Sequence, residues 1–201
     1  MASSHHLYLI RHLPTAGNRA RKYIGWTDEP IETADLELEA YREVLMPESG
    51  IVYGSDLLRA KESAELLFPG AVYRADARFR ECNFGDFEGK TYADLEMDKD
   101  YRAWLDNMRE LAPRGGESLA NVEERVLEAL LELPNGAAVV THGGPIRIAL
   151  SQFSKEPQDF WSWQIPHGSA WKFEWQSYGE LKEGGRCVSL SEVPIMGKET
   201  M

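Results

Sequence analysis

Residues 7–18 read Leu-Tyr-Leu-Ile-Arg-His-Leu-Pro-Thr-Ala-Gly-Asn, and the architecture of the chain can be worked out from them. The first four residues form an apolar run too short for an independent helix, with charge and Pro14 following, which indicates a buried strand. This strand would carry Arg11 and His12 to its carboxyl end, where open α/β sheets bind ligands. An Arg-His pair can equally end a strand in solvent, so its interpretation depends on the rest of the chain.

Two other short apolar runs have the same form. Residues 51–53 precede a Gly-Ser-Asp turn and a helix predicted over residues 57–68, whose first turn contains Arg59. Residues 137–140 precede Thr-His-Gly-Gly, so His142 also lies at the end of a predicted buried strand.

The segments after His142 complete the predicted sheet. Pro145 is suited to the first position of a helix. Residues 170–175 alternate as a half-buried strand, and residues 186–190 are predicted to pair with it antiparallel after a turn at Gly184-Gly185. Because strands and helices alternate, the sequence predicts an α/β fold: a three-layer sandwich with a mostly parallel central sheet, an antiparallel edge strand and helices on both faces.

The domain organisation follows from length and pattern. The 201 residues fit one domain, 1–201, with a helical insertion at about residues 90–115. Further helices are predicted over residues 33–46 and from Ser118 onward.

Composition excludes several classes of partner. The formal net charge is −11 and there is no basic stripe, which argues against nucleic acid and anionic membranes. Cys82 and Cys187 match neither a disulfide framework nor a zinc site, so we expect reduced thiols. Without a basic leader or an apolar run near eighteen residues, the chain is predicted to be cytoplasmic.

This acidic chain nevertheless places cationic or cation-capable groups at predicted strand ends, namely Arg11, His12, Arg59 and His142. The carboxyl ends of parallel strands meet at one edge, which predicts a local positive pocket. Two guanidinium groups and the helix start at Gly143 suit a phosphoryl group. Arg59 at a helix start opposes the helix dipole unless an anion binds there; the alternative is a salt bridge with Glu62 or Glu65.

The order of these motifs resembles that of the histidine phosphatase (phosphoglycerate mutase-like) superfamily over nearly the whole chain. The matching residues are Arg11-His12 with Thr15 and Asn18, Ser55 to Ala60 around Arg59, Glu81 with Phe84-Gly85 and Glu88-Gly89, Gly116 to Ser118, and Thr141 to Gly144. The departure is Leu13-Pro14, where the family usually has Gly-Glu; this affects loop shape and substrate choice rather than chemistry.

The resemblance implies a metal-independent phosphomonoesterase that acts through a phosphohistidine on a small phosphorylated metabolite, with no cofactor. His12 would attack phosphorus as a neutral imidazole, which the flanking arginines favour. Glu81 would protonate the leaving alcohol and then activate water. The residues expected to bind the phosphoryl oxygens are Arg11, Asn18, Arg59, His142 and Gly143.

The long loop after the first strand carries candidate specificity residues, namely Arg21, Tyr23 and Trp26. Its segment 23–30, Tyr-Ile-Gly-Trp-Thr-Asp-Glu-Pro, is similar to a Tyr-x-Gly-x-Thr-Asp-x-Pro segment of α-ribazole phosphatases. That likeness implies a cobalamin-pathway or sugar-phosphate substrate.

Three alternatives stay open. A cofactor-dependent phosphoglycerate mutase resembles this chain but is typically longer. A catalytically dead phosphate- or phosphopeptide-binding module would need the arginines but not both His12 and Glu81. A metal hydrolase would use His12, His142 and Glu81 as ligands, although no compact two-histidine helix motif is present. The expected partner is a small phosphorylated substrate, and an exposed edge strand could support a homodimer.

Overall fold

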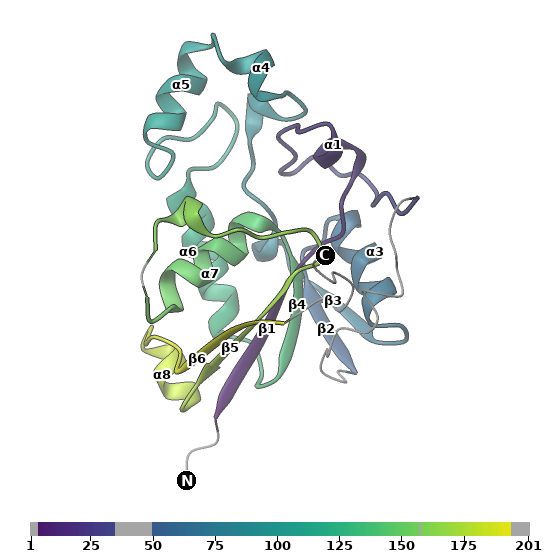
Figure 1. Cartoon of the computed structure of the whole chain (residues 1–201), viewed down its shortest axis with the longest axis vertical. Coiled ribbons are helices and arrows are strands. Elements are labelled where there is room, and N and C mark those ends of the chain that lie inside the picture. Colours follow the sequence, from purple (N-terminus) through teal and green to yellow (C-terminus); the bar gives the residue numbers. More distant parts are fainter. Residues whose placement is uncertain (1–3, 35–49, 157, 194–201) are drawn as a thin grey trace, which may run out of the picture.

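The computed structural model describes residues 4–34, 50–156 and 158–193, and its strands form one sheet in the order β3-β2-β4-β1-β5-β6 (Figure 1). The strands are β1 (His5–Arg11), β2 (Ile51–Gly54), β3 (Val72–Ala75), β4 (Ala137–Thr141), β5 (Ala170–Trp175) and β6 (Ser189–Val193). Strands β3, β2, β4 and β1 are parallel, β5 is antiparallel to β1, and β6 is antiparallel to β5. The predicted mostly parallel sheet with an antiparallel edge is confirmed.

Strand β4 lies between β2 and β1 in the sheet, and both of its faces are covered. All five of its residues are buried. Ala137 and Val139 pack into one hydrophobic cluster, whereas Ala138 and Val140 pack into a second. A strand covered on both faces has a continuous apolar sequence, which is the pattern that identified it.

Helices cover the two faces of the sheet and give it three layers, as predicted (Figure 1). The α-helices are α1 (Ala16–Arg19), α3 (Leu58–Leu67), α4 (Tyr92–Leu95), α5 (Lys99–Asp106), α6 (Leu119–Leu131), α7 (Gly143–Phe153) and α8 (Tyr178–Lys182), and the 3₁₀ helices are η1 (Ala77–Phe79), η2 (Gly85–Phe87) and η3 (Phe160–Ser162). Helices α6 and α7 pack on the face that carries Leu7 and Leu9 of β1. Helix α3 packs on the opposite face through Ala60 and Ala64. None of the helices in the described ranges is long and apolar enough to cross a membrane.

Helices α4 and α5 lie at one end of the molecule, away from the sheet, where the sequence predicted helices at about residues 90–115 (Figure 1). Side chains of Thr91 and Asp98 cap their amino ends. Tyr101 and Trp104 of α5 form a separate buried cluster with Phe87 and neighbouring apolar residues. The helix predicted over residues 33–46 falls on residues 35–49, which lie outside the described part.

Three local expectations need correction. The last strand is Ser189–Val193 rather than 186–190, and helix α8 occupies part of the connection that was predicted as a turn at Gly184-Gly185. Helix α7 begins at Gly143, so Pro145 is its third residue and not its first. Strand β3 was not predicted, because only one of its residues is even half-buried and its sequence shows no apolar alternation.

Two valines provide a matched test of this architecture. Val139 in β4 is 0% exposed, whereas Val72 in edge strand β3 is 60% exposed. We expect Val139→Ala to lower the free energy of unfolding by about 2 kcal/mol, because two methyl groups leave a packed core. Val72→Ala should change it by less than about 0.5 kcal/mol. Urea denaturation of both variants checks this, and equal losses would contradict the central position of β4.

Candidate active site

His12 directly follows β1 and is 3% exposed. Its backbone N–H donates a hydrogen bond to the Thr141 carbonyl at 2.9 Å. The ring atom Nδ1 lies 2.7 Å from the Leu13 carbonyl oxygen, which can only accept, so Nδ1 carries the proton. Burial, with the charges of Arg59 and Arg11, holds the pKa of His12 well below its usual 6.5. The ring is therefore neutral at pH 7, with the lone pair on Nε2.

Two guanidinium groups lie beside this histidine, that of the buried Arg59 and that of the half-buried Arg11. Arg59 is 0% exposed and donates to the carbonyls of Gly25 (2.6 Å) and Thr27 (2.9 Å). Arg11 donates to the Ile165 carbonyl, and burial lowers its pKa to about 10, which leaves it cationic at pH 7. The Nε atoms of both arginines are buried without a hydrogen-bond partner among the described residues. Buried charges with unused donors favour the binding of an anion.

His142 occupies the N-cap position of α7 without a side-chain capping hydrogen bond, and its ring lies beside that of His12. It is 1% exposed, its ring centroid lies 4.9 Å from that of His12, and burial holds its pKa well below 6.5. Neither of its ring nitrogens has a partner in the described part of the chain. A Cβ atom on Gly143 would lie 3.2 Å from Arg147 Nη1 and 3.5 Å from Arg11 Cζ. A side chain at this position would therefore be tight only against Arg147, and both guanidinium groups lie close to the helix start.

Asn18 belongs to the short helix α1, which Thr15 caps. Its Oδ1 accepts from the Thr15 backbone N–H at 3.3 Å and lies 3.1 Å from His167 Nε2. His167, whose ring centroid is 5.4 Å from that of His12, was not predicted. It precedes β5, and because β5 is antiparallel its amino end lies at the same edge as the carboxyl end of β1. Knowledge of that strand direction would have pointed to it.

Glu81 approaches the same helix start. Its carboxylate accepts hydrogen bonds from the backbone N–H groups of Cys82 (2.9 Å) and Gly144 (3.0 Å). A Cβ atom on Gly144 would collide with this carboxylate, so only glycine permits the contact. The charge of Glu81 is the largest one acting on both Arg11 and Arg59.

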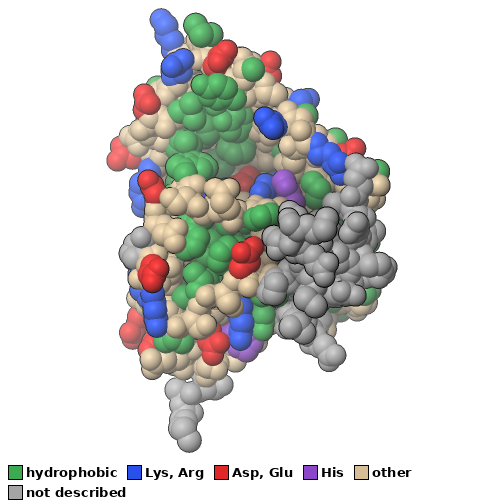
Figure 2. Space-filling view, viewed as in Figure 1, with side chains coloured by type: hydrophobic (Ala, Val, Ile, Leu, Met, Phe, Trp, Pro, Cys, Tyr) green, Lys and Arg blue, Asp and Glu red, His purple; other side chains and the backbone are tan. Residues whose placement is uncertain are grey.

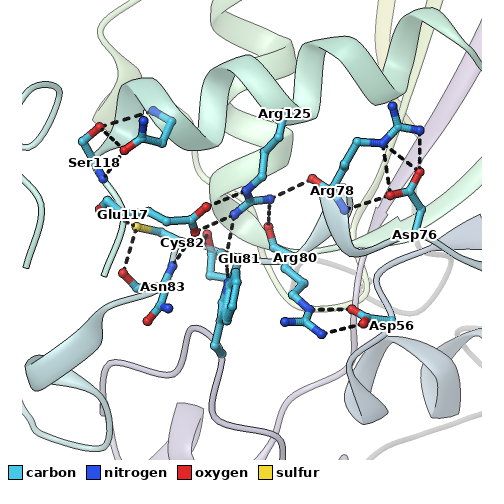
Figure 3. Close-up of polar contacts among 12 residues, drawn as sticks. Asp56, Asp76, Arg78, Arg80, Glu81, Cys82, Asn83, Glu117, Ser118 and Arg125 are labelled. Carbon is cyan, nitrogen blue, oxygen red and sulfur yellow. Dashed lines mark hydrogen bonds and ion pairs between the residues drawn. The ribbon is translucent and has the colours of Figure 1, made fainter. Parts of the chain in front are cut away.

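The backbone around Glu81 is fixed by Arg125 of α6, a residue that the sequence did not single out (Figure 3). Its guanidinium group makes two 2.9 Å contacts with the Glu117 carboxylate. It also donates to the carbonyls of Arg78 and Arg80 at 2.7 Å and of Glu81 at 2.9 Å. One side chain thus holds most of the segment that carries the candidate acid.

Glu88 has a similar role for the loop after β1. Its carboxylate accepts from the backbone N–H groups of residues 25–27 and of Phe84, at 2.8 to 3.2 Å. Arg59 donates to carbonyls of the same three-residue segment. The segment is therefore held between the Glu88 carboxylate and the Arg59 guanidinium group, and these contacts keep Arg59 in place.

The three candidate specificity residues have different surroundings. Tyr23 lines a pocket beside Glu81, and its hydroxyl forms a hydrogen bond with the hydroxyl of Tyr101. Trp26 Nε1 donates to the Glu81 carbonyl at 3.1 Å, so it supports the candidate acid. Arg21 is exposed, has a left-handed φ of 54° and is not among the pocket-lining residues.

This pocket has a volume of about 510 Å³. It is lined by Tyr23, Glu81, Cys82, Phe84, Trp104, Leu105, Met108, Leu119, Gly144, Arg147, Phe160 and Trp161. Figure 2 shows hydrophobic side chains gathered above a hollow in which histidine, basic and acidic side chains are visible. A polar, cationic region and an apolar pocket therefore meet at Glu81.

The structure brings together the predicted residues His12, Arg11, Arg59, His142, Gly143, Asn18 and Glu81. Arg59 donates to backbone carbonyls, and the salt bridge considered for it with Glu62 or Glu65 is not seen among the described residues. Among residues 4–34, 50–156 and 158–193, no group of three His, Cys, Asp or Glu side chains could hold a metal ion. The set considered as metal ligands therefore finds no support.

The chain is similar to a known protein family and to individual proteins. A family model described as the histidine phosphatase superfamily (branch 1) matches residues 7–183. A glucosyl-3-phosphoglycerate phosphatase of Mycolicibacterium vanbaalenii is 31% identical over 77% of this chain and 76% of its own length. A protein of Escherichia fergusonii, "Probable phosphoglycerate mutase GpmB", is 34% identical over 68% of this chain and 69% of its own length.

Solved structures share the fold. A phosphoglycerate mutase from Thermus thermophilus has a TM-score of 0.69 and 32% identity, covering 94% of this chain and 98% of the other. A "putative alpha-ribazole-5'-P phosphatase" from Escherichia coli K-12 has a TM-score of 0.80 over 96% of both chains. At 21% identity, this second likeness shows the fold alone.

The lowered pKa values of three histidines lead us to expect that the protein loses stability in acid. The pKa values of His12, His142 and His167 are lowered, the last to about 3, so below pH 6.5 the unfolded chain binds more protons. The free energy of unfolding should therefore fall as pH falls, by about 1.4 kcal/mol per histidine between pH 7.5 and 5.5. His167→Asn should remove one such contribution in urea denaturation at the two pH values. An equal pH dependence in variant and wild type would contradict the lowered pKa.

Proposed function

Because the chain belongs to branch 1 of the histidine phosphatase superfamily, we propose that it is a metal-independent phosphomonoesterase that works through a phosphohistidine intermediate. The observation that carries the proposal is a neutral, buried His12 beside the buried Arg59 and the half-buried Arg11, with the Glu81 carboxyl group close to both guanidinium groups. A nucleophile, an anion site and a proton donor are the three parts that this reaction needs.

In the first step, His12 Nε2 attacks phosphorus as the ester oxygen leaves in line. The N–P bond forms, the P–O bond breaks, and the proton of the Glu81 carboxyl passes to the leaving oxygen. The Leu13 carbonyl keeps the Nδ1 proton in place and stabilises the positive charge on the ring.

In the second step, water attacks the phosphohistidine. The Glu81 carboxylate takes a proton from the water as its oxygen bonds to phosphorus, and the P–N bond breaks. Inorganic phosphate leaves, His12 is again neutral, and Glu81 is again protonated. The Glu81 carboxyl group thus donates a proton in the first step and accepts one in the second.

The phosphoryl oxygens would bind where donors are unused. Arg11 and Arg59 supply fixed positive charge, and His142 supplies a ring N–H. The Asn18 Oδ1 atom is occupied, so its amide nitrogen is the atom left to donate. These groups are oriented before the substrate arrives, so little reorganisation is needed as charge moves towards the leaving oxygen.

A cofactor-dependent phosphoglycerate mutase is the second candidate, which the similarity to proteins named probable phosphoglycerate mutases favours. It would use the same phosphohistidine but transfer the phosphoryl group to a hydroxyl instead of water. Interconversion of phosphoglycerates without release of phosphate would establish it.

Three assays with excess chelator test the proposal. We expect hydrolysis of p-nitrophenyl phosphate by wild type, and loss of at least about 10³-fold in His12→Ala. Glu81→Gln should lose about 10² to 10⁴-fold on an alkyl phosphate but much less on p-nitrophenyl phosphate, whose leaving group needs no proton. His6→Ala, on the same strand but outside the site, is the matched control.

The outcomes discriminate among the candidates. An acid-labile, base-stable phosphoryl label on wild type but not on His12→Ala would support the intermediate. Activity abolished by chelator would contradict the proposal in favour of a metal hydrolase. Phosphate binding without turnover on a broad panel of esters, α-ribazole phosphate included, would indicate a binding module.

Arg125 should act through Glu81. Arg125→Lys loses the forked contacts with Glu117 and the backbone, so we expect kcat for an alkyl phosphate to fall about tenfold while that for p-nitrophenyl phosphate changes little. Arg109→Lys is the matched control, because Arg109 forms an exposed ion pair with Glu123. An equal loss on both substrates would show that Arg125 does not act by positioning the acid.

A further inference from the structure

The pocket beside Glu81 is lined by apolar side chains that are partly exposed. Its lining residues Tyr23, Phe84 and Leu119 are half-buried, and Trp161 is 56% exposed. Leaving apolar surface in a concave site costs free energy, which burial against a ligand would recover. Figure 2 shows that hydrophobic side chains also gather around the hollow on this face.

The pocket is continuous with the reacting atoms. Glu81 and Gly144 line it, and they are also joined by the hydrogen bond that places the candidate acid. Since Glu81 protonates the leaving oxygen, the carbon skeleton attached to that oxygen begins at the pocket. The occupant is therefore the alcohol part of the substrate.

The pocket offers few polar contacts to that alcohol. As far as the chain is described, Glu81 and Arg147 are its charged lining residues. Arg147 Nε donates to the Trp163 carbonyl at 3.1 Å, its guanidinium group lies 5.6 Å from the Trp161 ring centroid, and its Nη1 lies towards the helix start at Gly143, on the polar side of the pocket. The Tyr23 hydroxyl is bonded to Tyr101. A glycerate or sugar would leave its hydroxyl or carboxylate groups poorly paired here.

We propose that the preferred substrate is a phosphate monoester of an alcohol that carries a flat apolar ring, with the ring held between Trp161 and the aromatic wall of Tyr23 and Phe84. This inference rests on the proposed function, whose Glu81 chemistry sets the direction of the leaving group. Rings in such a wall pack edge-to-face, as Tyr23 and Phe84 already do with centroids 5.1 Å apart.

The test compares benzyl phosphate with ethyl phosphate. Both leaving groups are primary alcohols of similar acidity, so a difference in kcat/KM reports the ring and not the need for a proton. We expect kcat/KM to be roughly tenfold to 100-fold higher for benzyl phosphate, from burial of one ring. Equal values would overturn the inference while leaving the phosphatase proposal intact.

Two variants localise the effect. Trp161→Ala should lower kcat/KM for benzyl phosphate at least fivefold more than that for ethyl phosphate. Tyr178→Ala removes an exposed ring from α8, outside the pocket, and should alter neither. A ring preference retained in Trp161→Ala would overturn the placement of the ring.

A binding measurement keeps this inference separate from catalysis. Benzylphosphonate and methylphosphonate cannot be hydrolysed, and calorimetry should give the former a Kd at least tenfold lower. That result in an enzyme inactive on both esters would uphold the pocket and reject the proposed chemistry. Equal affinities, with a dimer that dissociates in Trp161→Ala, would show that a second copy of the chain covers this surface and would overturn the inference.

Discussion

The burial of the Arg59 guanidinium is the constraint on which the site depends. Its charge is fully removed from solvent, at a cost of several kcal/mol in real proteins. Carbonyls of residues 25–27 and the charge of Glu81 offset part of this cost. The Nε atom stays unpartnered among the described residues, so an anion bound there, as in the proposed function, would complete the compensation. Burial and then the same charge lower the pKa of His12, so this cation helps to keep the ring neutral, and in the proposed function it would also attract the phosphoryl group.

The strand order explains how the chain assembles this environment. Adjacent parallel strands β2, β4 and β1 place Arg59, His142 and His12 at one edge of the sheet. Strand β5 runs the other way, so the residue His167, which precedes it, reaches the same edge from its amino end. Around this edge the chain as a whole carries a net charge of −11, which repels an anionic substrate at long range. In the proposed function, affinity for phosphate would therefore come from these few local groups.

The sequence predicted the parts of the molecule that local patterns encode. Short apolar runs identified β1, β2 and β4, and residues at their carboxyl ends supplied most of the candidate site. Arg125 was not predicted, and Glu88 was named only as part of a family motif without a role, because both act through contacts across many residues, such as the 61 to 63 that separate Glu88 from residues 25–27. Nothing in the local pattern of a helical arginine or a loop glutamate indicates which distant backbone it holds. Strand β3 lies at the edge of the sheet and buries almost none of its side chains, so its sequence needs no apolar alternation and shows none.

The meeting of a cationic half and an apolar half at Glu81 also bears on the choice between water and a hydroxyl as phosphoryl acceptor. A mutase must hold a dephosphorylated acid close to the phosphohistidine until the group returns, which requires cations for its carboxylate. Here Arg147 is the cationic side chain in the described lining: its Nε donates to the Trp163 carbonyl, its guanidinium group lies 5.6 Å from the Trp161 ring centroid, and its Nη1 lies near the helix start at Gly143, while the rest of the wall is mostly apolar. In the proposed function, such a wall would hold a glycerate weakly, which would leave water as the acceptor of the phosphoryl group. The apolar pocket is therefore an argument for the proposed hydrolysis, whereas the proposed phosphoryl-binding half would serve either reaction.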